Sequence, residues 1–146
     1  MNTRILQMRT LDKKIRTIKS HLPIIPKGQS WIRVIRESLG MTVKQLAERL
    51  GITQGRVSIM EQNENNMKIS TLEKVTAAMD CQFVPLFIPN KTLEQTVRNQ
   101  AEKKAKEILA NVNHNMALEN QLSTEEEILQ DMIEDYIHQN TKQIWS

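Results

Sequence analysis

Two side chains that can hydrogen-bond to the edges of nucleic-acid bases lie close together in the first half of the chain. Gln54 and Arg56 are separated by Gly55 in the sequence TQGRVS. A glutamine amide can form two hydrogen bonds with adenine, and an arginine guanidinium can form two with guanine. Such contacts require a rigid element that holds both side chains at a groove of the duplex.

The stretch from Thr42 to Glu61 predicts that element, because it has the spacing of a helix-turn-helix. Its sequence, TVKQLAERLGITQGRVSIME, places Ala47 four residues before Gly51 and Val57 six residues after it. A small residue lets the second helix approach the first, and glycine tolerates the positive φ of the turn. Valine then returns an apolar side chain to the shared core. Such a corner presents the N-terminal end of its second helix to a DNA major groove.

The basic residues of the chain are concentrated in the same half as this motif. Residues 1–60 hold twelve Lys or Arg and three Asp or Glu, whereas residues 119–146 hold one Lys and seven acids. Residues 61–118 hold seven of each, and the whole chain carries a net charge of +3. A basic half that coincides with a helix-turn-helix predicts a nucleic-acid partner, and the acidic end indicates a second partner.

Other chemistry has little support in the sequence. His21, His114 and His138 lie far apart, without the spacing of a metal site, and no glycine-rich phosphate loop is present. Cys81 has no Cys or His nearby and is expected to be a buried thiol. We therefore predict a binding protein that is not an enzyme and needs no metal or cofactor. The lack of an apolar run of about 18 residues and of a signal-peptide core predicts a cytoplasmic location without a membrane partner.

The remaining sequence predicts an all-α fold. Thr42 and Thr53 are expected N-caps of the two motif helices, the second of which runs to about Gln62. Apolar residues at helical spacing predict further helices, with Ser70 and Ser123 as the N-caps of two of them. These helices span residues 3–20, 29–39, 70–79, 91–120 and 123 onward. An apolar stripe in the last helix either packs on the long helix before it or fits the groove of a partner.

Residues 81–89, CQFVPLFIP, depart from the helical pattern and hold both phenylalanines of the chain. They predict one β-strand, with Pro85 at a sheet edge or bulge. Since a lone strand leaves backbone groups unpaired, its expected partner is the same strand in a homodimer. The alternative is a buried extended segment across the helices. The expected domains are a basic helix and linker (1–28), the helix-turn-helix (29–80), the dimerisation strand (81–90) and a C-terminal helical region (91–146).

The segment from Leu46 to Met79 resembles the Xre-type helix-turn-helix family of phage repressors. The resemblance lies in LAERLGITQGRVSIMEQ, followed by ISTLEKVTAAMDC. It implies a lambda-repressor-like domain whose second helix starts near Thr53 and lies in the major groove. Gly55 departs from the long polar residue often found there, which removes one base contact or lets the backbone approach closely. The expected DNA-binding residues, in which Thr42, Lys44 and Gln62 would contact phosphates, are Thr42, Lys44, Thr53, Gln54, Gly55, Arg56, Ser58 and Gln62.

Residues 4 to about 121 are similar to a family found on bacterial mobile elements, known as mobile mystery protein A. The shared features are the basic N-terminal helix and the sequences WIRVIRESLGMTVKQLAERLGITQ, DCQFVPLFIP and NMALENQ. Members are typically encoded beside a protein with a Fic domain, an enzyme class that transfers AMP from ATP to target proteins. The resemblance implies the antitoxin of a type II toxin–antitoxin pair that represses its own promoter.

Asn115, Glu119 and Asn120 are the residues through which this resemblance implies inhibition. Fic enzymes are commonly silenced by a helix bearing Ser or Thr, three residues, Glu, and then Gly or Asn. Glu119 and Asn120 match the last two positions, whereas Asn115 departs from the first. A glutamate there can form a charge-assisted bond with an arginine that would bind the γ-phosphate of ATP. It would thereby block productive placement of the nucleotide.

Two alternative functions stay open at this point. The chain can be a stand-alone repressor whose C-terminal helices only dimerise, or an adaptor whose helix-turn-helix has lost DNA binding. A gel shift on the upstream promoter region separates repressor from adaptor. A pull-down with the neighbouring gene product separates antitoxin from stand-alone repressor.

Overall fold

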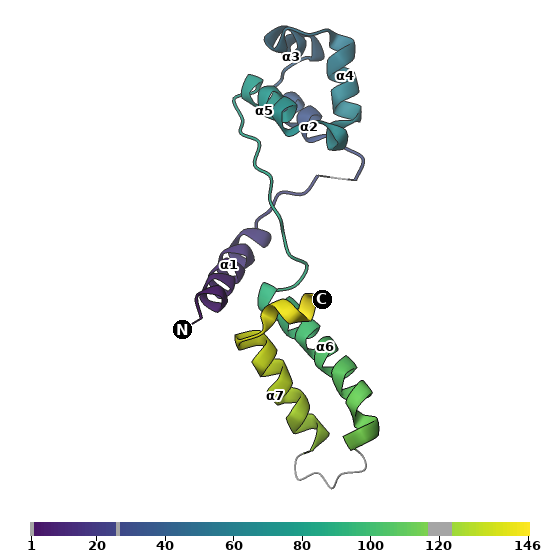
Figure 1. The fold of residues 1–146 in the computed structure, drawn as a ribbon. Coiled ribbons are helices and arrows are strands. Elements are labelled where there is room, and N and C mark those ends of the chain that lie inside the picture. The colour runs from purple at the N-terminus through teal and green to yellow at the C-terminus, as the bar shows by residue number, and fades with distance from the viewer. Residues whose placement is uncertain (1, 26, 117–123) are drawn as a thin grey trace. The chain divides into compact units, whose positions relative to one another are not determined.

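The computed structural model describes residues 2–25, 27–116 and 124–146, and this part of the chain is helical with irregular connections (Figure 1). It divides into two compact units. The central unit is Pro23–Phe87, and the terminal unit combines Met1–Leu22 with Ile88–Ser146. None of the described helices is both long enough and apolar enough to cross a membrane.

The central unit contains four α-helices and one 3-10 turn, and its core joins both helices of the motif. The elements are α2 (Trp31–Ser38), α3 (Val43–Leu50), α4 (Gln54–Gln62), η1 (Glu64–Asn66) and α5 (Ile69–Ala78). Ala47 and Val57 are both buried in one cluster with Leu46, as the spacing predicted. Gly51 ends α3 with a φ of 67°, the left-handed conformation that favours glycine. The helix-turn-helix prediction is therefore confirmed.

The two predicted N-caps of the helix-turn-helix are confirmed, whereas the N-cap predicted for the next helix is wrong. The Thr42 hydroxyl accepts a hydrogen bond from the backbone N–H of Gln45, and Thr53 does the same for Arg56. The prediction of Ser70 as an N-cap is wrong, because α5 already begins at Ile69 and has no side-chain cap. Local spacing thus identified a helix here but misplaced its first turn.

The strand predicted over residues 81–89 is absent from the structure, which describes that whole segment as irregular. A strand needs a neighbouring strand to pair its backbone groups, and the described chain contains no second one. The segment is not a buried one either, since Val84, Leu86 and Phe87 are exposed, Phe87 to 96%. Cys81 is also exposed, which corrects the expectation of a buried thiol.

The terminal unit is built on two helices that lie side by side, α6 (Leu93–Met116) and α7 (Glu125–His138) (Figure 1). Ala101 and Ala105 of α6 meet the apolar stripe of α7, and Ile144 of the 3-10 turn η2 (Thr141–Trp145) joins the same core. Small residues on α6 let the larger side chains of α7 approach closely. The stripe therefore packs on the long helix, the first of the two predicted alternatives. Ser123, the expected cap of the last helix, lies outside the described residues, and Thr124 caps α7 instead.

The basic N-terminal helix α1 (Thr3–Lys19) belongs to the terminal unit. Its Asp12 carboxylate is buried and accepts the backbone N–H groups of Leu93 at 2.7 Å and Glu94 at 3.1 Å. These groups form the first turn of α6, where the helix dipole favours a negative charge. In the first turn of α1, Arg4 donates to the carbonyl of Ile137 near the end of α7. Hydrogen bonds from the middle and the first turn of α1 thus join it to α6 and α7.

Candidate nucleic-acid interface

Helix α4 has one face in the core of the central unit and one face in solvent. Val57 is 1% exposed, and Met60 packs partly against the same cluster. Because an α-helix advances about 100° per residue, Gly55, Ser58 and Gln62 lie on the opposite side. The core contact of α4 therefore fixes which of its side chains are available to a ligand.

The residues predicted from sequence to contact DNA all lie in exposed positions of the motif. They occupy the N-cap and first turn of α3, and the N-cap and exposed face of α4. Lys44 and Arg56 bring positive charge to these two helix starts, and neither forms an ion pair with another residue of the described chain. The exposed set is Thr42, Lys44, Thr53, Gln54, Gly55, Arg56, Ser58 and Gln62.

The two capping threonines keep a hydrogen-bond donor for a ligand. In each cap the hydroxyl oxygen accepts from a backbone N–H, at 3.1 Å for Thr42 and 3.2 Å for Thr53. The hydroxyl proton is not used by that bond and can be donated to an anionic oxygen. Each cap also lies at the positive end of a helix dipole, which favours anions such as phosphate.

A buried ion pair that the sequence analysis missed holds α2 against α4. The Arg36 Nε atom lies 2.6 Å from Glu61 Oε1, and the two side chains are only 8% and 10% exposed. Arg36 also donates to the carbonyl oxygen of Met41, at 2.9 Å, in the connection before α3. Its position four residues after the buried Ile32 was the available signal, because a charge on an apolar helix face needs a buried partner.

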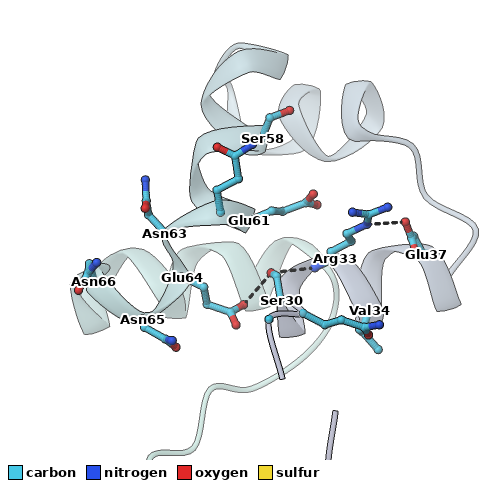
Figure 2. A pocket seen from close by; sticks show the side chains of 13 residues that line it. Ser30, Arg33, Val34, Glu37, Ser58, Glu61, Asn63, Glu64, Asn65 and Asn66 are labelled. Atoms are coloured by element: carbon cyan, nitrogen blue, oxygen red, sulfur yellow. Dashed lines mark hydrogen bonds and ion pairs between the residues drawn. The ribbon is translucent and has the colours of Figure 1, made fainter. Parts of the chain in front are cut away.

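Glu64 forms a second link, between the turn that follows α4 and the start of α2. Its carboxylate accepts the backbone N–H groups of Ile32 at 2.7 Å and Trp31 at 2.9 Å, and the hydroxyl of Ser30 at 3.2 Å. Figure 2 shows this carboxylate pointing from η1 towards Ser30. The negative charge satisfies free N–H groups of the first turn of α2, and with the Arg36–Glu61 pair it fixes the C-terminal end of α4 relative to α2.

A polar hollow of about 720 Å³ continues the exposed side of α4 towards α2 and η1 (Figure 2). Ser58 and Gln62 line it from α4, and Asn65 lines it from η1. On α2, Arg33 Nε donates to Glu37 Oε1 at 2.9 Å, and this hydrogen bond lowers the pKa of the Glu37 carboxyl. With three carboxylates in its lining, the hollow can offer amide donors to a phosphate but is not a concentrated anion site.

The structure can be searched for a metal site, but it describes little of the residues predicted to inhibit a toxin. Over residues 2–25, 27–116 and 124–146, no group of three His, Cys, Asp or Glu is placed to hold a metal ion. Asn115 lies in the last described turn of α6, and only its backbone is described. Glu119 and Asn120 lie outside the described residues. The predicted inhibitory residues are therefore untested by this structure.

Comparison with known proteins identifies the central unit by sequence. Residues 32–91 match the Cro/C1-type helix-turn-helix DNA-binding domain family, a range that includes most of α2 and all of α3, α4 and α5. No curated protein and no solved structure matches the chain. The match agrees with the core-anchored α4, its exposed polar face and the glycine turn. Within residues 32–91 the chain thus carries a helix-turn-helix DNA-binding domain of the Cro/C1 type.

Proposed function

We propose that this chain is a transcriptional repressor that binds operator DNA, including its own promoter, through α4. The observation that carries the proposal is the exposed face of α4 within the matched domain. Gln54 and Arg56 at its N-terminal end supply the hydrogen-bond groups that read adenine and guanine. Thr42 and Lys44 at the start of α3 supply a hydroxyl and a cation for the phosphate backbone.

The test is binding of the purified full chain to DNA from upstream of its gene, compared with random DNA of equal length. Arg56→Ala should weaken operator binding by about 1–3 kcal/mol and relax specificity at one base pair. Lys44→Ala should weaken binding to both DNAs alike, because phosphate contacts carry no sequence information. Lys74→Ala, an exposed lysine of α5, is the matched control. Equal affinity of the wild type for both DNAs would refute a sequence-specific repressor.

We propose further that the repressor is a homodimer paired through residues 81–88. The support is an irregular, exposed segment whose apolar side chains include Val84, Leu86 and Phe87. Pairing with the same segment of a second copy would satisfy backbone groups and bury those side chains. A dimer would place two α4 helices on half-sites about one helical turn apart, which a footprint on a palindromic operator would reveal.

The second candidate function is the antitoxin of a Fic-domain toxin, with the terminal unit as the part that engages the enzyme. Its support is the resemblance to mobile mystery protein A, together with a compact unit formed apart from the DNA-reading helices. Helix α6 extends at least to Met116, which brings the helix to the edge of the expected inhibitory sequence. In this proposal Glu119 pairs with the nucleotide-binding arginine of the toxin, and Asn115 and Asn120 flank that contact.

Co-expression with the neighbouring Fic protein tests the antitoxin role. Glu119→Gly should restore AMP transfer while the complex still forms in a pull-down. Glu107→Gly is the matched control, because it places the same glycine on an exposed position of α6. If Glu119→Gly binds the toxin and still suppresses AMP transfer fully, Glu119 is not the inhibitory residue. If no complex forms with the wild type, the stand-alone repressor is the correct function.

A further inference from the structure

The exposed face of α4 contains one large apolar side chain among its polar ones. Ile59 is 58% exposed, whereas Val57, two residues earlier, is 1% exposed in the core. At 100° per residue, Ile59 lies on the same side of α4 as Gly55, one turn before it, and beside Gln62, three residues after it. An isoleucine on this face gains nothing from the core, so its apolar surface is available to whatever docks on α4.

Gly55 leaves open space on the same face of α4 that carries Ile59. Its backbone is helical, and a Cβ atom built at this position would meet no atom within 4 Å. Neither a positive φ nor close packing therefore requires glycine here, although glycine disfavours a helix. Long helical side chains lean towards the preceding turn, so Ile59 borders the open position at Gly55 but stays more than 4 Å from a Cβ atom built there. The two residues together form an apolar notch on a face that is otherwise polar.

Thymine carries the apolar group of the major groove that fits such a notch. Each base pair shows a distinct pattern in that groove, and only thymine adds a C5 methyl group. The notch is continuous with Gln54 and Ser58 on the face of the matched DNA-binding domain. We propose that Ile59 and Gly55 are specificity-determining residues that recognise a thymine by contact with its methyl group. This inference rests on the proposed function, since it requires α4 to lie in the major groove.

The difference between thymine and uracil isolates this contact, because the two bases differ only by the C5 methyl. Burial of one methyl group on Ile59 corresponds to about fourfold in affinity. The operator is first defined by selection from random duplexes with the full-length protein. Each thymine of the selected site is then replaced singly by deoxyuridine, and binding is measured for the wild type and for Ile59→Ala.

We expect at least one thymine in each half-site at which deoxyuridine weakens wild-type binding about fourfold, and at which Ile59→Ala binds both duplexes equally. Ile69→Ala, an isoleucine of similar exposure at the start of α5, should keep the discrimination. Methyl recognition is refuted if the wild type binds every deoxyuridine duplex as tightly as the original. It is also refuted if Ile59→Ala keeps the difference. If the selection yields no preferred sequence, the proposed repressor function fails first, and the inference fails with it.

Discussion

The buried pair of Arg36 and Glu61 should dominate the stability of the central unit. Arg36→Met leaves the Glu61 carboxylate buried without its partner, and Glu61→Leu leaves Arg36 with only the longer contact to Glu37, at 3.9 Å. Removal of one partner of a buried ion pair typically costs about 3–5 kcal/mol. The central unit has 65 residues, Pro23 to Phe87, and globular domains carry roughly 0.05–0.15 kcal/mol per residue. Its total stability is therefore roughly 3–10 kcal/mol. One substitution should remove about 30% of it or more.

The double variant Arg36→Met/Glu61→Leu should be far more stable than either single variant. Both charges are then gone, and apolar side chains of roughly similar volume fill the space between α2 and α4. Replacement of a whole buried ion pair by well-packed apolar residues is often neutral, or stabilising by about 1–4 kcal/mol. The carbonyl oxygen of Met41 still loses its hydrogen bond from Arg36, which offsets part of this gain.

Urea unfolding monitored by the fluorescence of Trp31 measures this effect in the full chain. The chain holds two tryptophans, so a Trp145→Phe background leaves Trp31 in the central unit as the reporter. Arg33→Gln, which breaks the exposed pair with Glu37, is the control and should leave the unfolding midpoint nearly unchanged. Single variants that lose less than about 1 kcal/mol, or a double variant as unstable as the singles, would refute the reasoning.

Three shorter predictions concern the terminal unit, the helix α4 and the segment after α5. Asp12→Ala should destabilise the terminal unit by about 1–3 kcal/mol in thermal unfolding, because the N–H groups of Leu93 and Glu94 lose their acceptor. An unchanged unfolding temperature would argue against a role of Asp12 as the N-terminal cap of α6. Gly55→Ala should stabilise the central unit by about 0.4–1 kcal/mol and yet weaken operator binding, and tighter binding would contradict the open notch. Leu86→Lys should convert the proposed dimer to monomer in light scattering, and a retained dimer mass would exclude pairing through that segment.

The helix-turn-helix could be predicted from sequence because its determinants are local. The caps at Thr42 and Thr53 each join residues three apart, and the turn at Gly51 depends on one residue's φ. The interactions that position these helices are not local, since Arg36 and Glu61 are 25 residues apart. The only sign of such a pair in the sequence is indirect: a charged residue at a helix position where an apolar residue is expected.

Asp12, in the terminal unit, is a second charged residue at an apolar position of a helix. It lies four residues after the buried Met8, at a position where the helical stripe would otherwise continue. Helical spacing alone would place Leu11 on that stripe, but Leu11 is 41% exposed while Asp12 is buried. The charge at this position indicates that Asp12 has a buried partner. The sequence does not identify that partner, because the backbone N–H groups of α6 are 81 and 82 residues away. The prediction of a β-strand at 81–89 was wrong for a related reason. The residue pattern indicates an extended segment, but it does not specify a second segment whose backbone could pair with it.

The distribution of charge gives the proposed second copy a role in the proposed DNA binding. Much of the positive charge of residues 1–60 lies in α1, which belongs to the terminal unit, whereas the central unit holds eight Lys or Arg and six Asp or Glu. Arg36 is neutralised by Glu61, and Arg33 is paired with Glu37. Six Lys or Arg of one central unit therefore remain outside the ion pairs of the described chain for contacts with phosphates, and each released counterion contributes separately to affinity. Two copies on one operator would double those contacts, so the proposed dimer and the proposed repressor depend on each other.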